Sequence, residues 1–210
     1  MIETEYVILK EAYSLGTDVQ AIKDFYTEWA DTYDTDLLLA IGYAGAEIAA
    51  EALCKHVSDT ALILDAGCGT GLVGIELIKR KFDLTIDGID LTPVMLEHSR
   101  KKGAYRKLNE ADLFEPLREH EDDVYEGIVC VGVFSKGHVG PHGLDELVRI
   151  AKPGAPIVLT VLEDAFEDGG FKEKIEQLEA EGLAKLLDVT LSPYYPKQEI
   201  SCQLVVLEVA

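Results

Sequence analysis

The residues best suited to chemistry lie in one short stretch, where an acid and alternating glycines follow an apolar run. Asp65 ends the apolar segment 61–64, and a segment with helically spaced apolar residues begins at Leu72. The glycines between them are Gly67, Gly69 and Gly71. Glycine adopts positive φ readily and lets backbone N–H groups approach a ligand. Because a helix start adds unpaired N–H groups and a partial positive charge, we expect a strand, a turn and a helix that together hold a nucleotide.

The glycine spacing leaves two nucleotide classes open. A dinucleotide fingerprint has the form G-x-G-x-x-G, but Leu72 occupies the position of its third glycine. Gly74 leaves room for a degenerate form of that fingerprint. A plain tight turn rarely needs three glycines in five positions, so the pattern favours a ligand over a purely structural turn.

Apolar periodicity predicts an α/β chain. Helices are expected at 17–29, 42–57, 72–80, from Pro93 onward, at 142–151 and at about 170–181. Strands are expected at 61–64, 84–90, 105–108, 122–134, 157–162, 186–191 and 200–209. For residues 1–16 we expect a loosely attached arm or a short helix. The last two strands have no helix between them, which predicts an antiparallel hairpin at the sheet edge.

An acid ends the second expected strand. Asp90 closes the segment 84–90, 19 residues after Gly71. In nucleotide-binding folds an acid at this position accepts hydrogen bonds from ribose hydroxyls. We therefore expect Asp90 to bind the ligand held by the glycine turn.

The catalytic candidates surround the end of the fourth expected strand. The apolar density of 124–134 predicts a central parallel strand, and ligands bind outside the carboxyl ends of such strands. His138 follows this strand and is a candidate general base, with an exposed loop histidine as the alternative. Tyr33 and Ser135 are candidates to position the substrate.

The stretch from Asp65 to Gly71, with its acid two residues before the first glycine, resembles motif I of class I S-adenosylmethionine-dependent methyltransferases. The resemblance implies that S-adenosylmethionine is the cofactor, that the glycines pass under its methionine part, and that Asp65 orients its amino group. The string 111–113 resembles the segment that hydrogen-bonds the adenine amino group. The implied cofactor-binding residues are Asp65, Ala66, Gly67, Cys68, Gly69, Gly71, Asp90, Leu91, Met95, Ala111, Asp112, Leu113, Val131, Gly132, Trp29 and Tyr33.

The resemblance also implies a fold. It is a Rossmann-like three-layer sandwich with a seven-stranded, mostly parallel sheet and an antiparallel terminal hairpin. Dinucleotide folds usually keep the final strand parallel, so the expected hairpin favours S-adenosylmethionine over a dinucleotide.

Three longer strings narrow the resemblance to the Williams-Beuren syndrome chromosome region methyltransferase-like proteins. They are 29–34, 87–96 and 131–141, and the last is the most specific. The chain departs from the family at Lys136, where a second histidine is expected, and at 155–156, where a glycine usually follows. The first departure argues against an acid or base role at position 136. No methyl acceptor comes with the resemblance.

For several residues, two interpretations of their role remain open. The family's N-terminal tyrosine helps to close over the cofactor, which implies a lid role for Tyr33 and Trp29. Alternatively, these residues are four apart and pack one helix face on the core. Met95 either touches the adenine ring or fills the core. Tyr194 and Tyr195, in the expected terminal loop, are weaker candidates to line the pocket.

Length and charge restrict the partners. The 210 residues suit one domain, with a helical cap over 1–57 and a cofactor-binding core over 58–210. The 39 acidic and 19 basic side chains give a net charge of −20, which repels nucleic acids and anionic lipids. Four dispersed cysteines indicate reduced thiols and no metal site. The sequence has no signal-peptide pattern and no apolar run of membrane-spanning length, so we expect a cytoplasmic monomer or weak homodimer.

Three functions are consistent with these features. The leading hypothesis is an S-adenosylmethionine-dependent methyltransferase that acts on a small molecule, without a nucleic-acid or membrane partner. The second is a non-catalytic scaffold or sensor that binds S-adenosylmethionine, since the glycine turn and Asp90 are intact in either case. The third is a dinucleotide oxidoreductase, which Leu72 and the expected hairpin disfavour.

Overall fold

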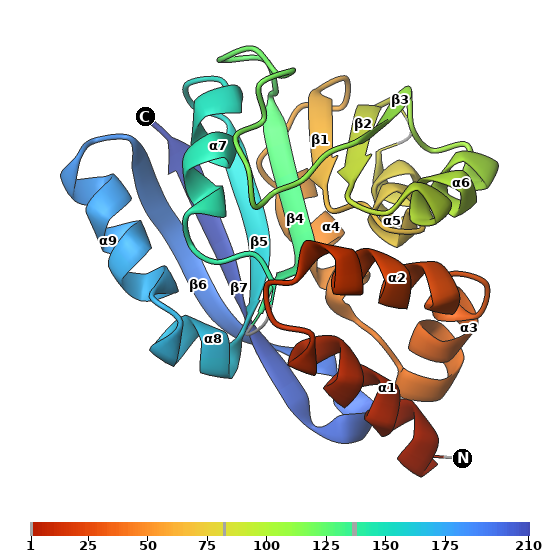
Figure 1. The fold of residues 1–210 in the computed structure, drawn as a ribbon. Coiled ribbons are helices and arrows are strands. Elements are labelled where there is room, and N and C mark those ends of the chain that lie inside the picture. Colours follow the sequence, from red (N-terminus) through yellow and green to blue (C-terminus); the bar gives the residue numbers. More distant parts are fainter. Residues whose placement is uncertain (1, 82, 136–137) are drawn as a thin grey trace.

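The computed structural model describes residues 2–81, 83–135 and 138–210 and shows one seven-stranded sheet in the order β3-β2-β1-β4-β5-β7-β6 (Figure 1). The strands are β1 (Leu62–Ala66), β2 (Thr85–Asp90), β3 (Lys107–Glu110), β4 (Gly127–Phe134), β5 (Pro156–Leu162), β6 (Ala184–Tyr195) and β7 (Ile200–Val209). Strands β1 to β5 run parallel to one another, whereas β7 runs antiparallel to both β5 and β6. The predicted α/β sheet with its antiparallel terminal hairpin is confirmed.

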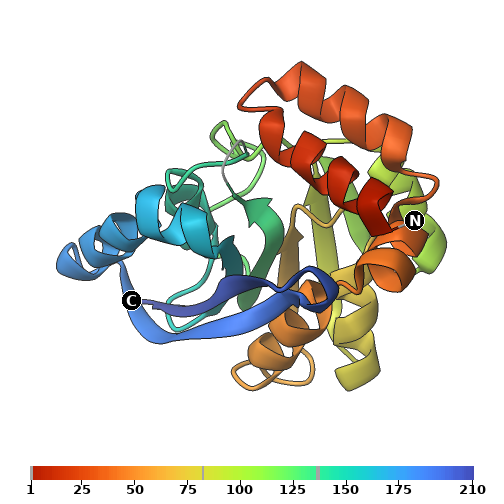
Figure 2. The ribbon, with the colours of Figure 1, turned by 90° about the horizontal axis from the view of Figure 1, so that it is seen from below.

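Helices cover both faces of the sheet and its carboxyl end. They are α1 (Ile2–Ser14), α2 (Val19–Trp29), α3 (Tyr33–Thr35), the π-helix η1 (Asp36–Ile41), α4 (Gly45–Cys54), α5 (Leu72–Arg80), α6 (Pro93–Lys102), α7 (Gly143–Ile150), α8 (Glu163–Asp168), α9 (Phe171–Ala180) and the 3-10 turn η2 (Pro196–Gln198). Helices α4 and α5 lie on one side of the sheet, and α7, α8 and α9 lie on the other (Figure 2). Helices α1 and α2 lie across the carboxyl ends of the strands (Figure 1).

Side chains that alternate along the central strands fill two apolar cores. On β1, Ile63 packs into the core beneath α4 and α5, and Leu64 packs into the core beneath α7 and α9. Val129 and Cys130 alternate in the same way on β4. A fully buried aliphatic side chain contributes about 1.5–3 kcal/mol. Burial on both faces therefore fixes the register of the strands whose ends carry the site.

The N-terminal segment is more firmly attached than an arm would be. Helix α1 occupies most of 1–16, and its Leu9 and Ala12 are only 3% and 2% exposed. These residues are three apart and so share one helix face, which joins the core beneath α4 and contacts η1. Asp18 caps α2, because its carboxylate accepts hydrogen bonds from two backbone N–H groups of the first turn.

The terminal hairpin is longer than the sequence predicts. Residues 192–195, expected in the loop, pair with β7 as the end of β6. The connection is η2, followed by Glu199 in the left-handed conformation at φ +55°. Serine and proline in 192–195 indicate a loop, but an edge strand tolerates both. Strand β3 is shifted from 105–108 to 107–110, and the short helix α8 lies where no element is predicted.

Within the described residues, no single helix has the length and apolar character needed to cross a membrane. The segments Tyr33–Ile41 and Gly45–Cys54 meet that requirement only as a pair, and they are bent by 93° relative to each other.

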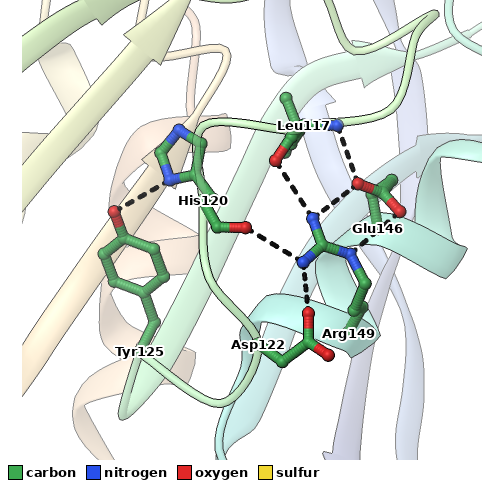
Figure 3. Close-up of polar contacts among 6 residues, drawn as sticks. All are labelled: Leu117, His120, Asp122, Tyr125, Glu146 and Arg149. Carbon is green, nitrogen blue, oxygen red and sulfur yellow. Dashed lines mark hydrogen bonds and ion pairs between the residues drawn. The ribbon is translucent and has the colours of Figure 1, made fainter.

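One arginine of α7 fixes the loop between β3 and β4. Arg149 donates to the backbone carbonyls of Leu117 and His120, each at 3.0 Å (Figure 3). The same guanidinium forms ion pairs with Asp122 and Glu146. Glu146 also accepts a 2.7 Å hydrogen bond from the N–H of Leu117. The planar fork of the guanidinium therefore holds helix and loop together, and the first residues of this loop reach the functional site.

Candidate functional site

A cavity opens at the carboxyl ends of β1, β2 and β4, next to α2. We call it the first cavity. Its lining residues are Ile22, Tyr26, Tyr33, Gly67, Gly69, Asp90, Leu91, Thr92, Met95, Ala111, Asp112, Leu113, Phe114, Val131, Gly132, Val133, His138 and Val139. Most of the residues predicted to contact a ligand are therefore brought together here.

The glycine turn after β1 presents backbone to the first cavity. The N–H groups of Gly67 and Cys68 donate to the carbonyl of Ile89 on β2, at 2.8 and 2.9 Å. A Cβ at Gly67 would lie 2.1 Å from the side chain of Val133. Gly69 has φ +51°, and a Cβ there would meet no atom within 4 Å. Packing therefore requires glycine at position 67, and the positive φ favours glycine at position 69. The space above Gly69 stays open.

Asp90 stands at the end of β2 and reaches the glycine turn. Its Oδ2 accepts a 2.7 Å hydrogen bond from the N–H of Gly69, and its Oδ1 accepts a 2.8 Å bond from the N–H of Thr92. Burial raises the pKa of Asp90 to about 6, although these two bonds act in the opposite direction. A carboxylate has about four lone-pair sites, so two remain for the hydroxyls of a ligand. Asp90 lines the cavity, and its contact with a ribose stays a prediction.

Asp65 lies behind the glycine turn and not on the cavity wall. Its Oδ2 accepts a 2.6 Å hydrogen bond from the hydroxyl of Tyr105, and its Oδ1 has no partner in the part of the chain that the structure describes. Burial raises the pKa of Asp65 to about 7. The contact of Asp65 with the cofactor's amino group therefore stays a prediction.

Tyr105 also explains Gly74. The N–H of Gly74 donates to the Tyr105 hydroxyl at 3.1 Å, and a Cβ at Gly74 would lie 2.4 Å from the tyrosine ring. Gly74 is therefore required by packing between α5 and the segment before β3. This requirement removes the reason for counting it in a dinucleotide fingerprint.

Three more residues of the predicted cofactor site shape the turn from behind the wall. Ala66 and Cys68 are buried, and Gly71 is the N-cap residue of α5, at φ +92°. A Cβ at Gly71 would lie 2.8 Å from the hydroxyl of Ser99. Direct contact of these residues with the cofactor stays a prediction.

Apolar side chains and one carboxylate form the wall from α6 and the loop after β3. Met95, Ala111 and Leu113 line the cavity together with Asp112. The Oδ1 of Asp112 accepts a 2.8 Å hydrogen bond from the N–H of Phe114. Phe114 also lines the cavity but was missed from the sequence, although it directly follows the recognised string. This wall suits a purine that carries an amino group.

His138 reaches the first cavity between two hydroxyl groups. Its Nδ1 lies 2.8 Å from Ser135 Oγ, and its Nε2 lies 3.2 Å from the hydroxyl of Tyr26. Burial lowers the pKa of His138 to about 4, so the imidazole is neutral at pH 7. Ser135 is 7% exposed and does not line the cavity, so its predicted role in positioning the substrate stays a prediction. The base role of His138 stays a prediction, and Lys136 lies outside the described residues.

Two tyrosines bring the N-terminal helices to the site. Tyr26 and Tyr33 line the first cavity, and burial raises the pKa of both phenols, which are therefore neutral. Trp29 lies away from this cavity, with its ring 4.7 Å from that of Tyr33 and its Nε1 donating to Asp36 at 2.8 Å. For Trp29, the structure thus supports the interpretation that its side chain packs on the core. Tyr26 was missed, although it stands four residues after Ile22 on the same helix face.

The electrostatics of the first cavity suit a positively charged ligand. No lysine or arginine is among the described lining residues, and the one histidine there is neutral. The acids on the wall are Asp90 and Asp112. A nucleoside that carries a sulfonium group fits this arrangement. The contacts of Asp90 with its ribose, of Asp112 and Met95 with its base, and of the glycine turn with its amino-acid part stay predictions.

Comparison with known proteins identifies the family. A family model described as a methyltransferase domain matches residues 63–154. Methyltransferase-like protein 27 of Homo sapiens is 32% identical over 155 residues, which cover 72% of this chain and 62% of the relative. Demethylmenaquinone methyltransferase of Deinococcus radiodurans is 30% identical over 143 residues, which cover 67% of this chain and 59% of the relative. The chain thus spans about three fifths of the length of these curated relatives.

A solved structure supports the fold. A TehB-like S-adenosylmethionine-dependent methyltransferase from Corynebacterium glutamicum is 19% identical and has a TM-score of 0.66, covering 88% of this chain and 98% of that chain. The family match argues against a dinucleotide as the ligand of the glycine turn. It confirms the predicted cofactor, S-adenosylmethionine, for this family. By sequence and fold, the chain belongs to the class I S-adenosylmethionine-dependent methyltransferases.

Proposed function

We propose that this protein transfers a methyl group from S-adenosylmethionine to a small-molecule acceptor. The observation that carries the proposal is the first cavity, in which the glycine turn, Asp90 and Asp112 meet next to α2. Helix α2 contributes Ile22 and Tyr26 to the wall, so the cap helices cover the site. A covered site suits a small acceptor better than a polymer.

The charge of the molecule supports the same class of acceptor. A net charge of −20 repels the phosphates of nucleic acids and the headgroups of anionic lipids. The described wall of the first cavity offers no lysine or arginine that would bind a phosphate. We therefore propose an acceptor that is neither a nucleic acid nor part of an anionic membrane.

The residues of this chain perform three tasks in the proposed reaction. When bound, S-adenosylmethionine supplies an electrophilic methyl group on a positively charged sulfur. Asp90 and the glycine turn orient the bound molecule, and the acids on the wall favour its positive charge. The neutral side chains of Tyr26, Tyr33 and His138 position the acceptor and exclude water from the reacting atoms.

Transfer of labelled methyl groups tests the proposal. The protein is incubated with methyl-labelled S-adenosylmethionine and a cell extract divided into a small-molecule filtrate and a macromolecular retentate. We expect label in filtrate compounds, and about tenfold less label with Asp90→Asn, because a hydrogen bond to a charged group contributes about 1.5–3 kcal/mol. Glu110→Gln is the matched control, because this half-exposed carboxylate at the end of β3 pairs with Lys23 and does not line the cavity. Label that enters only proteins, nucleic acids or lipids of the retentate would refute a small-molecule acceptor.

A further inference from the structure

A second cavity adjoins the first. Aromatic residues make up seven of its eleven lining residues. They are Trp29 and the tyrosines Tyr13, Tyr26, Tyr33, Tyr43, Tyr194 and Tyr195. Tyr26, Tyr33 and Gly132 line both cavities, so the two spaces share a wall. A molecule that extends from the first cavity past this wall would enter an aromatic enclosure.

The rings of the second cavity come from distant parts of the chain and hold one another. The hydroxyl of Tyr13 on α1 donates to that of Tyr195 at the end of β6, at 3.3 Å. The rings of Tyr194 and Tyr195 are 4.6 Å apart, and Tyr43 packs edge-on against Tyr194 at 5.2 Å. Such edge-to-face contacts fix ring orientation. The cavity is therefore a built structure and not a gap between mobile side chains.

The wall of the second cavity is uncharged but lies in negative surroundings. Among its described lining residues there is no acid, lysine, arginine or histidine. Burial raises the pKa of Tyr13 to about 12 and also raises the pKa of the other lining phenols, so all are neutral at pH 7. The negative charges of Asp164 and Asp90 further raise the pKa of Tyr13 and Tyr26, respectively. A buried anion would find no positive partner here, whereas a cation is attracted by aromatic faces and by nearby carboxylates.

We propose that the second cavity is an aromatic cage for an alkylamine group, and that the methyl acceptor is an amine whose methylated product is a cation. This inference rests on the proposed function and names the class of its acceptor. In the transfer, the lone pair of the unprotonated amine forms the new N–C bond. The C–S bond breaks, its electron pair stays on sulfur, and the positive charge passes from sulfur to nitrogen. Aromatic faces stabilise the charge that appears on the nitrogen.

The ionisable groups near the two cavities are consistent with an amine acceptor. An alkylamine is protonated at pH 7, so it first gives that proton to water and binds as the free base. A tertiary amine then loses no further proton in the transfer, and a secondary amine releases its remaining proton to water after the N–C bond has formed. A hydroxyl acceptor requires a base with a pKa near the working pH. His138, with a pKa lowered to about 4, and the neutral phenols do not meet that requirement.

Three probes of similar shape and different charge test the cage directly. Choline, its neutral isostere 3,3-dimethylbutan-1-ol and the anion 3,3-dimethylbutanoate are titrated into protein saturated with S-adenosylhomocysteine. Trp29 is the single tryptophan of the chain and lines the second cavity, so its fluorescence reports occupancy without any activity measurement. We expect choline to bind at least about tenfold more tightly than the isostere, because a desolvated cation–π contact contributes up to about 2 kcal/mol. Equal or tighter binding of the isostere or the anion, or no saturable change with any probe, would overturn the inference.

A matched pair of variants at Tyr13 separates the ring from its hydroxyl. Tyr13→Phe keeps the aromatic face and Tyr13→Leu removes it, and Tyr13 does not line the first cavity. We expect Tyr13→Phe to bind choline within about threefold of the wild type and Tyr13→Leu to bind it several-fold more weakly. Equal loss in both variants would contradict the role of the ring. If Tyr13→Leu does not fold, the three-probe comparison on the wild-type protein still decides.

Affinity for S-adenosylhomocysteine, measured alongside, separates this inference from the function on which it rests. If S-adenosylhomocysteine binds and label enters filtrate compounds that are not amines, only the amine class is refuted. If S-adenosylhomocysteine does not bind the wild-type protein, the proposed function itself fails.

Discussion

Two buried carboxylates beside the glycine turn make this site sensitive to pH. Burial raises the pKa of Asp65 to about 7 and that of Asp90 to about 6, both from an ordinary value of 3.8. The folded protein therefore holds protons on these groups more tightly than the unfolded chain does. Their contribution to stability is complete below about pH 4 and is lost as the pH rises through 6 and 7.

We expect Asp65→Asn to reduce this loss of stability with rising pH. For Asp65, a rise of about three pKa units corresponds to a free energy on the order of 4 kcal/mol between pH 4 and 8. Denaturant unfolding across this range should show a clearly flatter pH dependence for Asp65→Asn than for the wild type. Asp59→Asn, at a carboxylate that is 78% exposed, is the control and should keep the wild-type slope. An unchanged slope in Asp65→Asn would show that this carboxylate is not the titrating group.

The environment of His138 favours a positioning role. A base with a pKa near 4 gains little driving force by accepting a proton at pH 7. We expect His138→Gln to lower kcat by less than about tenfold, whereas loss of an effective general base costs about 10²–10⁴-fold. The measurement is steady-state methyl transfer with the identified acceptor, with the exposed His142→Gln as the control. A loss of 100-fold or more, specific to His138, would restore the base role.

At the scale of elements, the turn between β1 and α5 depends on a contact distant in sequence. Tyr105 fills the space beside Gly74 and ties α5 to Asp65. We expect Gly74→Ala to destabilise the protein by about 1–3 kcal/mol, because the added methyl group overlaps the ring. In a Tyr105→Leu background, where the overlapping ring atoms are absent, the same change should cost much less, since alanine favours helix over glycine by about 0.5–1 kcal/mol. Chemical denaturation of the four proteins gives this double-mutant cycle, and additive effects would contradict the contact.

The contacts of Arg149 lead to a second prediction at the scale of elements. Lysine retains the charge but cannot reproduce the fork that joins Leu117, His120 and Glu146. We expect Arg149→Lys to lower the free energy of unfolding by about 1–3 kcal/mol and to speed amide hydrogen exchange in the loop 115–124. Lys79→Ala removes an exposed ion pair and should stay within about 0.5 kcal/mol of the wild type. Unchanged exchange in the loop of Arg149→Lys would show that the loop is held by other contacts.

Local patterns predicted most of the elements and many of the residues that line the first cavity, and contacts between residues distant in sequence decided the rest. The turn and Asp90 were predictable because glycine spacing and an acid at a strand end have local physical causes. The position of Asp65 behind the turn was not, because it depends on Tyr105, 40 residues away. Likewise, the rings of the second cavity come from α1, α2, α3, the loop before α4 and β6, and only the folded chain brings them together. Tyr194 and Tyr195 were expected to line a pocket, and they line this second cavity and not the first.

At the scale of the whole molecule, the net charge of −20 adds a long-range attraction for a cationic ligand. S-adenosylmethionine carries one more positive charge than S-adenosylhomocysteine. Because salt shortens the screening length from about 10 Å at 0.1 M to about 3 Å at 1 M, we expect added salt to weaken binding of S-adenosylmethionine several-fold. Binding of S-adenosylhomocysteine should change little under the same conditions. Parallel titrations in low and high salt measure both, and equal salt dependence would contradict an electrostatic preference for the sulfonium.

The claim on which the account depends is that the first cavity holds an adenosyl ligand through Asp90. Calorimetric titration of S-adenosylhomocysteine into the wild-type protein and into Asp90→Asn tests it most directly. We expect saturable one-to-one binding by the wild type and at least about tenfold weaker binding by a folded Asp90→Asn protein, because a charged hydrogen bond is lost. Absence of binding to the wild type, or equal affinity in the variant, would contradict the account.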